Sequence, residues 1–152
     1  SEMKGKIVSI NISDEKKGPK RKIATGKLIE GIGLEGDASN KPGPRQVSIT
    51  SVELLKEQAQ CPRFGKGEEF IVGPGNYSET LTLEGIDLSD IMIGDVFAAG
   101  EALIRISSRG MTCFEFCPWG RLEGECPLPK YFLFAEVIKD GAVSTGSVIE
   151  RV

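Results

Sequence analysis

The feature that most constrains the fold is a run of glycines and prolines over residues 31–44, between two apolar segments. It begins with the pattern G-x-G-x-x-G, the phosphate-binding turn of dinucleotide-binding folds, which requires a helix directly after it. The two prolines and the glycine of residues 42–44 prevent a helix from beginning there. We therefore exclude a Rossmann βαβ unit. We expect an irregular loop between strands, either an ordinary surface connection or a carrier of binding residues.

Short apolar segments separated by turn residues surround this loop. Alternation predicts a strand at residues 4–12, and further strands are expected at 23–32 and 46–49. Residues 94–97 and 102–107 predict one hairpin, and residues 132–138 and 142–152, around a turn at 139–141, predict a second. Thr50 to Glu53 has the spacing of a capping box, which predicts a helix over residues 51–60.

These segments, together with nineteen glycines, predict a mainly β fold. We expect a single domain over residues 1–152, a small curved β-barrel with one main helix and long irregular loops.

The charge of the chain excludes a general nucleic-acid binder. The net charge is −3, whereas such a protein needs a basic face to displace counterions from phosphates. Residues 16–22 hold five cations, but Gly-Pro at the centre of this segment favours a solvated turn.

No apolar run approaches the length that spans a membrane, and the first residues lack the pattern of a signal peptide. We expect a cytoplasmic protein with neither nucleic-acid nor membrane partners.

The sequence contains no histidine, which excludes Ser-His-Asp and Cys-His catalysis and any zinc site with imidazole ligands. It contains four cysteines: Cys61, Cys113, Cys117 and Cys126. Structural zinc sites usually have two close cysteine pairs, and the second pair is missing, so we expect no zinc. A reactive thiol is the alternative, since Arg109 lies four residues before Cys113 and a nearby cation favours the thiolate. Free cysteines can also be small buried hydrophobic residues.

Taken together and in order, the motifs of the chain resemble the MOSC domain, a module named after the C-terminal regions of molybdenum-cofactor sulfurases. The resemblance extends over nearly the whole chain and indicates a small stand-alone MOSC protein. The matching segments are Gly18-Pro19-Lys20, Gly33 to Asp37, Arg45-Gln46-Val47, Glu79 to Asp87, Ile93-Gly94-Asp95, Gly100-Glu101-Ala102 and Thr112-Cys113.

The resemblance implies a β-barrel-type fold and the binding of molybdopterin, the pterin of the molybdenum cofactor, or a related sulfur-carrying role. It implies a functional cysteine at Cys113, as ligand of the molybdenum ion or as persulfide carrier. A thiolate is the kind of soft ligand that this chemistry requires.

The remaining candidate residues suit a pterin that ends in a phosphate. Cations in irregular segments can hold the phosphate, and a carboxylate and a hydroxyl near residue 80 can hydrogen-bond the pterin. We expect Asp37, Arg45, Glu79 and Cys113 to line one cleft. The complete set of expected cofactor-binding residues is Lys20, Asp37, Lys41, Arg45, Glu79, Thr82 and Arg109.

Three hypotheses follow from the resemblance. The first is a protein of molybdenum-cofactor metabolism that binds the cofactor or carries sulfur, with the pterin or a sulfur donor protein as its partner. The second is a small molybdenum-dependent reductase of N-hydroxylated compounds. The third is a non-catalytic interaction module whose site has decayed.

Overall fold

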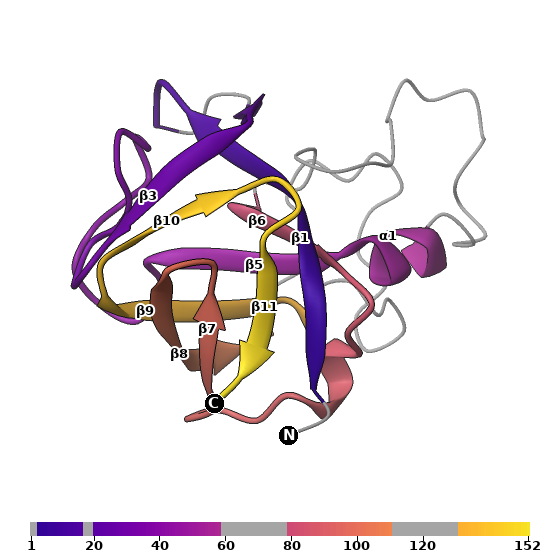
Figure 1. Ribbon diagram of the computed structural model, residues 1–152. Coiled ribbons are helices and arrows are strands. Elements are labelled where there is room, and N and C mark those ends of the chain that lie inside the picture. Colours follow the sequence, from indigo (N-terminus) through magenta and orange to yellow (C-terminus); the bar gives the residue numbers. More distant parts are fainter. Residues whose placement is uncertain (1–2, 17–19, 59–78, 111–130) are drawn as a thin grey trace, which may run out of the picture.

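The computed structural model describes residues 3–16, 20–58, 79–110 and 131–152 (Figure 1). Its elements are β1 (Lys4–Ser13), β2 (Lys20–Ile23), β3 (Thr25–Ile29), β4 (Gly33–Leu34), β5 (Val47–Ser51), α1 (Val52–Gln58), β6 (Leu81–Glu84), η1 (Leu88–Asp90), β7 (Val96–Ala99), β8 (Ala102–Arg109), β9 (Leu133–Lys139), β10 (Gly141–Ser144) and β11 (Val148–Arg151). In the described residues, no helix is long and apolar enough to cross a membrane.

Seven strands close into a barrel, in the order β1-β11-β7-β8-β9-β5-β6 and back to β1. Every pair is antiparallel except β5 with β6. β2 extends the sheet beyond β1, and β10, β3 and β4 form a second sheet. The two chain ends lie close together at one end of the barrel (Figure 1). Across the residues that the structure describes, the predicted mainly β fold with a barrel and one main helix is thus confirmed.

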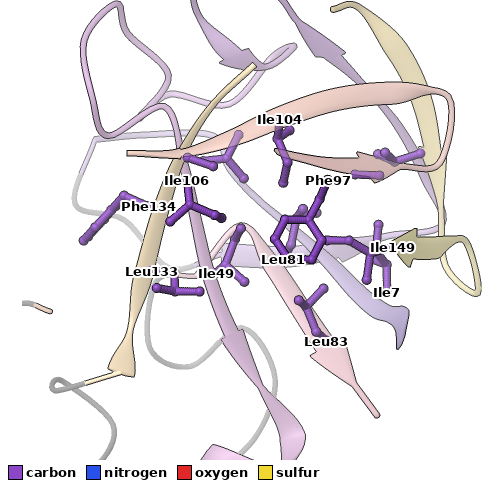
Figure 2. Packing of buried hydrophobic residues seen from close by; sticks show 14 of the residues in the cluster. Ile7, Ile49, Leu81, Leu83, Phe97, Ile104, Ile106, Leu133, Phe134 and Ile149 are labelled. Atoms are coloured by element: carbon purple, nitrogen blue, oxygen red, sulfur yellow. The ribbon is translucent and has the colours of Figure 1, made fainter. Parts of the chain in front are cut away.

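The barrel interior is filled by branched aliphatic side chains and phenylalanine. Ile7, Ile49, Leu81 and Leu83 point toward Phe97, and all five are at most 1% exposed (Figure 2). Alternating residues of each strand supply these side chains, since successive side chains point to opposite faces. The residues between them therefore face outward.

A bulge in β1 decides which of its residues face outward. The pairing of β1 with β6 shifts register between Ile7 and Ser9, so that Ile7 opposes Leu83 and Ile10 opposes Leu81. The extra residue allows Ile7 and Ile10 to belong to one core although three positions separate them. Ser9, Asn11 and Ser13 consequently lie on the opposite face of the strand.

Two of the predicted local structures are confirmed, with one difference at a cap. No helix begins within residues 37–44, and α1 lies within the predicted range 51–60, of which residues 59 and 60 lie outside the described residues. The capping box at Thr50 is wrong by one residue. Ser51 caps the helix, because its Oγ accepts a hydrogen bond from the Leu54 N–H at 3.1 Å. Glu53 instead accepts from the Gly85 N–H at 2.8 Å.

The hairpin of β7 and β8 is confirmed, whereas the predicted hairpin at the end of the chain is wrong. After β9, residues 141–144 leave the barrel and pair with β3, and only β11 returns to it. The strand expected over residues 23–32 is shorter, because β3 covers only Thr25–Ile29. β2 begins at Lys20, within the segment expected to be a solvated turn, because it pairs with β1. The pairing of β10 with β3 joins strands far apart in the sequence, whereas β2 pairs with its neighbour along the chain.

Candidate functional site

The outward side of β1, β6 and β5 carries buried polar side chains. Thr82 opposes Ser9 of β1 on one side and Thr50 of β5 on the other, so the three side chains share a face. We call this surface the polar face and define it as Ser9, Asn11, Ser13, Ser48, Thr50, Glu79, Thr80 and Thr82. Apart from the half-buried Ser48, each of these residues is at most 5% exposed. Burial of so many polar groups is costly unless each finds a partner.

A chain of hydrogen bonds connects four of the eight residues of the polar face. The Ser9 hydroxyl donates to Asn11 Oδ1 at 2.7 Å, and Asn11 Nδ2 donates to Thr82 Oγ1 at 3.2 Å. Thr82 Oγ1 in turn donates to Glu79 Oε2 at 2.7 Å. Glu79 is fully buried, so this chain holds a carboxyl group in place away from water. It brings two of the predicted residues, Glu79 and Thr82, into contact.

Two buried hydroxyl oxygens in the described residues, Thr50 Oγ1 and Ser108 Oγ, have no hydrogen-bond partner. Thr50 is fully buried and lies beside Thr82. Ser108 opposes Phe134 of β9, which in turn opposes Ser48 of β5, so this second hydroxyl faces the same side of the sheet. A buried hydroxyl without a partner is uncommon and calls for a specific explanation, such as a ligand group.

At the far end of β1, Asp37 organises a second polar cluster. Its Oδ1 accepts from the Ser13 N–H at 2.9 Å and from the Ser13 hydroxyl at 2.6 Å. Lys20 Nζ lies 3.4 Å from Asp37 Oδ2, and both side chains are at most 4% exposed. The backbone of Ala38 also donates to the Ser13 carbonyl at 2.9 Å. The cluster therefore fastens the glycine-rich loop to β1, and it joins the predicted residues Lys20 and Asp37.

Two further predicted cations, Lys41 and Arg45, are exposed. The Arg45 guanidinium lies 4.6 Å from the centroid of the Phe134 ring, a cation–π contact that holds it beside the row of Ser108 and Ser48. The described residues offer Arg45 no carboxylate partner. Its N–H donors therefore remain able to bind an anion.

Arg109 lies away from the other predicted residues, at the end of β8. Its Nη1 donates to the Ser89 carbonyl at 3.4 Å, and its guanidinium lies 5.9 Å from the Tyr131 ring centroid. Cys113 and the other three cysteines lie outside the described residues. Across the part of the chain that is described, no group of three acidic, histidine or cysteine side chains is placed to hold a metal ion.

Sequence reasoning missed Ser9, Asn11, Ser13 and Thr50. The available signal was the alternation of small polar and isoleucine residues from Ser9 to Ser13, which predicts a strand with one polar side. What the alternation does not reveal is that this side is buried and meets β6 and β5.

Comparison with solved structures gives matches over almost the whole chain. A crystal structure of a hypothetical protein matches with a TM-score of 0.74 and 25% identity, covering 99% of this chain and 68% of the other. The YUAD protein of Bacillus subtilis has a TM-score of 0.74 and 19% identity, covering 98% and 96%. YiiM of Escherichia coli has a TM-score of 0.66 and 23% identity, covering 97% and 69%.

No family model matches the sequence, and a search of curated proteins finds no relative. The comparisons therefore concern the fold. The chain shares its fold with the YUAD and YiiM proteins, and this fold is MOSC-like.

Proposed function

We propose that the chain binds a molybdenum–pterin cofactor, or carries sulfur for it, and that the polar face recognises the pterin. The observation that carries the proposal is the unpartnered Thr50 hydroxyl on a fully buried position of that face. A pterin ring presents both donors and acceptors along its edges. The polar face supplies hydroxyl, amide and carboxyl groups, so its chemistry fits such a ring.

The phosphate of the cofactor requires a cation that is not already neutralised. Lys20 is paired with Asp37 inside the protein, whereas Arg45 is exposed and held on Phe134. We therefore assign the phosphate to Arg45, with Lys41 as a second exposed cation, and give Lys20 the task of holding the glycine-rich loop. When bound, the cofactor would supply molybdenum redox chemistry or a transferable sulfur. Cys113, as metal ligand or persulfide carrier, enters this proposal through the family resemblance.

The test is native mass spectrometry of the purified protein, together with fluorescence of the oxidised pterin released on denaturation. We expect a bound pterin, or an additional sulfur atom on the peptide that contains Cys113. Arg45→Ala should reduce cofactor retention about tenfold, because a charge-assisted hydrogen bond is lost. Arg21→Ala is the matched control, since Arg21 is an exposed arginine that pairs with Asp14.

Each outcome distinguishes between hypotheses. A pterin that is retained and responds to Arg45→Ala supports cofactor binding, and a persulfide without a pterin supports sulfur carriage. Turnover of an N-hydroxylated compound by the loaded protein would favour the reductase hypothesis. Absence of both the pterin and the sulfur after expression with an intact cofactor pathway would contradict the proposal.

A further inference from the structure

A cavity of about 500 Å³ lies where β5 passes into α1 and β6 passes into η1. None of its described lining residues belongs to the polar face. Its volume is within the usual range for sites that bind small molecules. It is therefore a second location at which this chain can hold a ligand.

The cavity has an apolar floor and an acidic wall. Leu54, Ile86 and Leu88 are at most 6% exposed and form the floor. Glu53 and Asp87 contribute carboxylates to the wall. Neither carboxylate has a cationic partner in the described residues, although four other acidic side chains do.

Hydrogen bonds to backbone N–H groups hold both carboxylates in position. Glu53 Oε2 accepts from the Gly85 N–H at 2.8 Å, and Asp87 Oδ1 accepts from the Ser89 N–H at 3.0 Å. Each group thus uses one oxygen within the protein and has another oxygen to offer. The Ser89 hydroxyl also donates to Asp87 Oδ1, and the two hydrogen bonds from Ser89 lower the pKa of Asp87 by favouring its charged form.

A neighbouring cavity helps to identify the charge of the ligand. It has a volume of about 310 Å³ and shares Gly85, Ile86 and Asp87 with the first, but Lys4 and Arg151 line its other side. No described cation lines the first cavity, although Arg109 contacts two of its lining residues. Of these two cavities, the first combines an acidic wall with no described lining cation, so it suits a ligand with one positive charge. A second positive charge on the ligand would be repelled by Arg109.

We propose that this cavity binds a small organic cation with one ammonium group and a compact apolar body. The ammonium would bind between Glu53 and Asp87, and the apolar body would cover Leu54, Ile86 and Leu88. This site is separate from the polar face, so the proposal does not depend on the function proposed above.

The experiment uses the full chain and three probes of nearly equal shape: benzylammonium, benzyl alcohol and benzoate. Binding is followed by backbone amide NMR shifts as each probe is added at low salt. We expect benzylammonium to shift the amides of Leu54 and of residues 85–89. Benzyl alcohol should bind about tenfold more weakly, because it lacks the charge-assisted contact, and benzoate should not bind. Added salt should weaken the benzylammonium shifts.

Variants test the wall directly. Glu53→Gln and Asp87→Asn each remove a charge but keep an oxygen for the backbone N–H, and each should weaken benzylammonium binding about tenfold. Glu101→Gln, an exposed acid at the β7–β8 turn, is the control with the same charge change and should have no effect.

The proposal is overturned if benzyl alcohol binds as tightly as benzylammonium, if both wall variants bind like the unmodified chain, or if the shifts occur elsewhere. Absence of any shift up to the solubility limit of benzylammonium also overturns it. Thr50→Val should leave these shifts unchanged, which separates this result from the test of cofactor binding.

Discussion

At the scale of single residues, Asp37 is a buried carboxylate whose charge is balanced inside the protein by Lys20. Three donor groups from Ser13 and Lys20 converge on its carboxylate, and its side chain is only 1% exposed. In such a place a charge is tolerated because its partner is present. Removing either member of the pair should therefore destabilise the fold by more than the intact pair stabilises it, because the remaining charge is buried without a partner.

Asp37→Asn should lower the free energy of unfolding by about 3 kcal/mol, because it leaves the Lys20 ammonium buried without a counter-charge. Urea denaturation followed by circular dichroism measures the change. The matched control is Asp14→Asn, which breaks the exposed ion pair with Arg21 and should have no measurable effect. Equal effects of the two variants would contradict this account of the buried pair.

Asp87 supplies a prediction about pH. The hydroxyl and the backbone N–H of Ser89 hold the pKa of Asp87 below its usual value of 3.8. A lowered pKa means that Asp87 stabilises the fold above its usual pKa, and that this contribution disappears as the pH falls through the lower value. Ser89→Ala removes the larger of the two causes, so the pKa of Asp87 should rise toward 3.8. Carboxyl carbon NMR titration measures it, and an unchanged pKa would show that the hydroxyl is not responsible.

At the scale of elements, the polar face joins three strands that are distant in sequence. β1 and β6 are joined by the hydrogen bond from Asn11 to Thr82. Directly before β6, the hydroxyl of Thr80 contacts that of Ser48 in β5 at 3.1 Å. Threonine and serine occupy buried positions of the polar face at which apolar side chains would be expected if the sheet were selected for stability alone. The unpartnered Thr50 hydroxyl is the clearest case.

Thr50→Val and Thr82→Val make the same chemical change on adjacent strands and should have opposite effects. Thr50→Val removes a buried hydroxyl without a partner and should raise the free energy of unfolding by about 1 kcal/mol. Thr82→Val removes the link between Asn11 and Glu79 and should lower it by about 2 kcal/mol. If the Thr50 hydroxyl contacts the cofactor, Thr50→Val should both raise the free energy of unfolding and reduce cofactor retention. Destabilisation by Thr50→Val would contradict this assignment.

The elements that the sequence predicts are those set by neighbours along the chain. The alternation of residues 4–12, the helix and the hairpin of β7 and β8 depend on local periodicity and on turns, and all three are present in the structure. The bulge at Ile7 and the position of the cap at Ser51 depend on pairing with β6 and on the approach of Gly85. Motifs predicted Glu79 and Thr82 as site residues, but only the register of β5 with β6 adds Thr50.

At the scale of the whole molecule, the barrel is closed by the pairing of the first strand with the last. Lys4 opposes Glu150, a contact between the two ends of the chain that no local pattern encodes. Because seven other strands close the barrel, β10 is not part of it and pairs with β3 in the second sheet. The chain must therefore pass from one sheet to the other directly after β9, at residues 140 and 141.

Gly141 is the residue that permits this passage, and it carries the last prediction. A Cβ at Gly141 would collide with the backbone of Glu101 and Ala102 at the β7–β8 turn, where Glu101 donates to the Ala142 carbonyl at 3.0 Å. Its φ is not in the left-handed region, so the requirement for glycine is one of space. Gly141→Ala should therefore lower the free energy of unfolding by about 3 kcal/mol, because backbone rather than a flexible side chain must move.

Gly31→Ala is the control that separates the effect of a steric collision from the effect of backbone strain. Gly31 has a φ of 77°, but no other group lies within 4 Å of the position that an alanine methyl would take, so its variant should lose only about 1 kcal/mol through backbone strain. Urea denaturation of both variants measures the difference. Amide hydrogen exchange then locates it, because Gly141→Ala should increase exchange in β10 and at the β7–β8 turn together. If Gly141→Ala were no more destabilising than Gly31→Ala, the close approach of the two sheets at this point would be wrong.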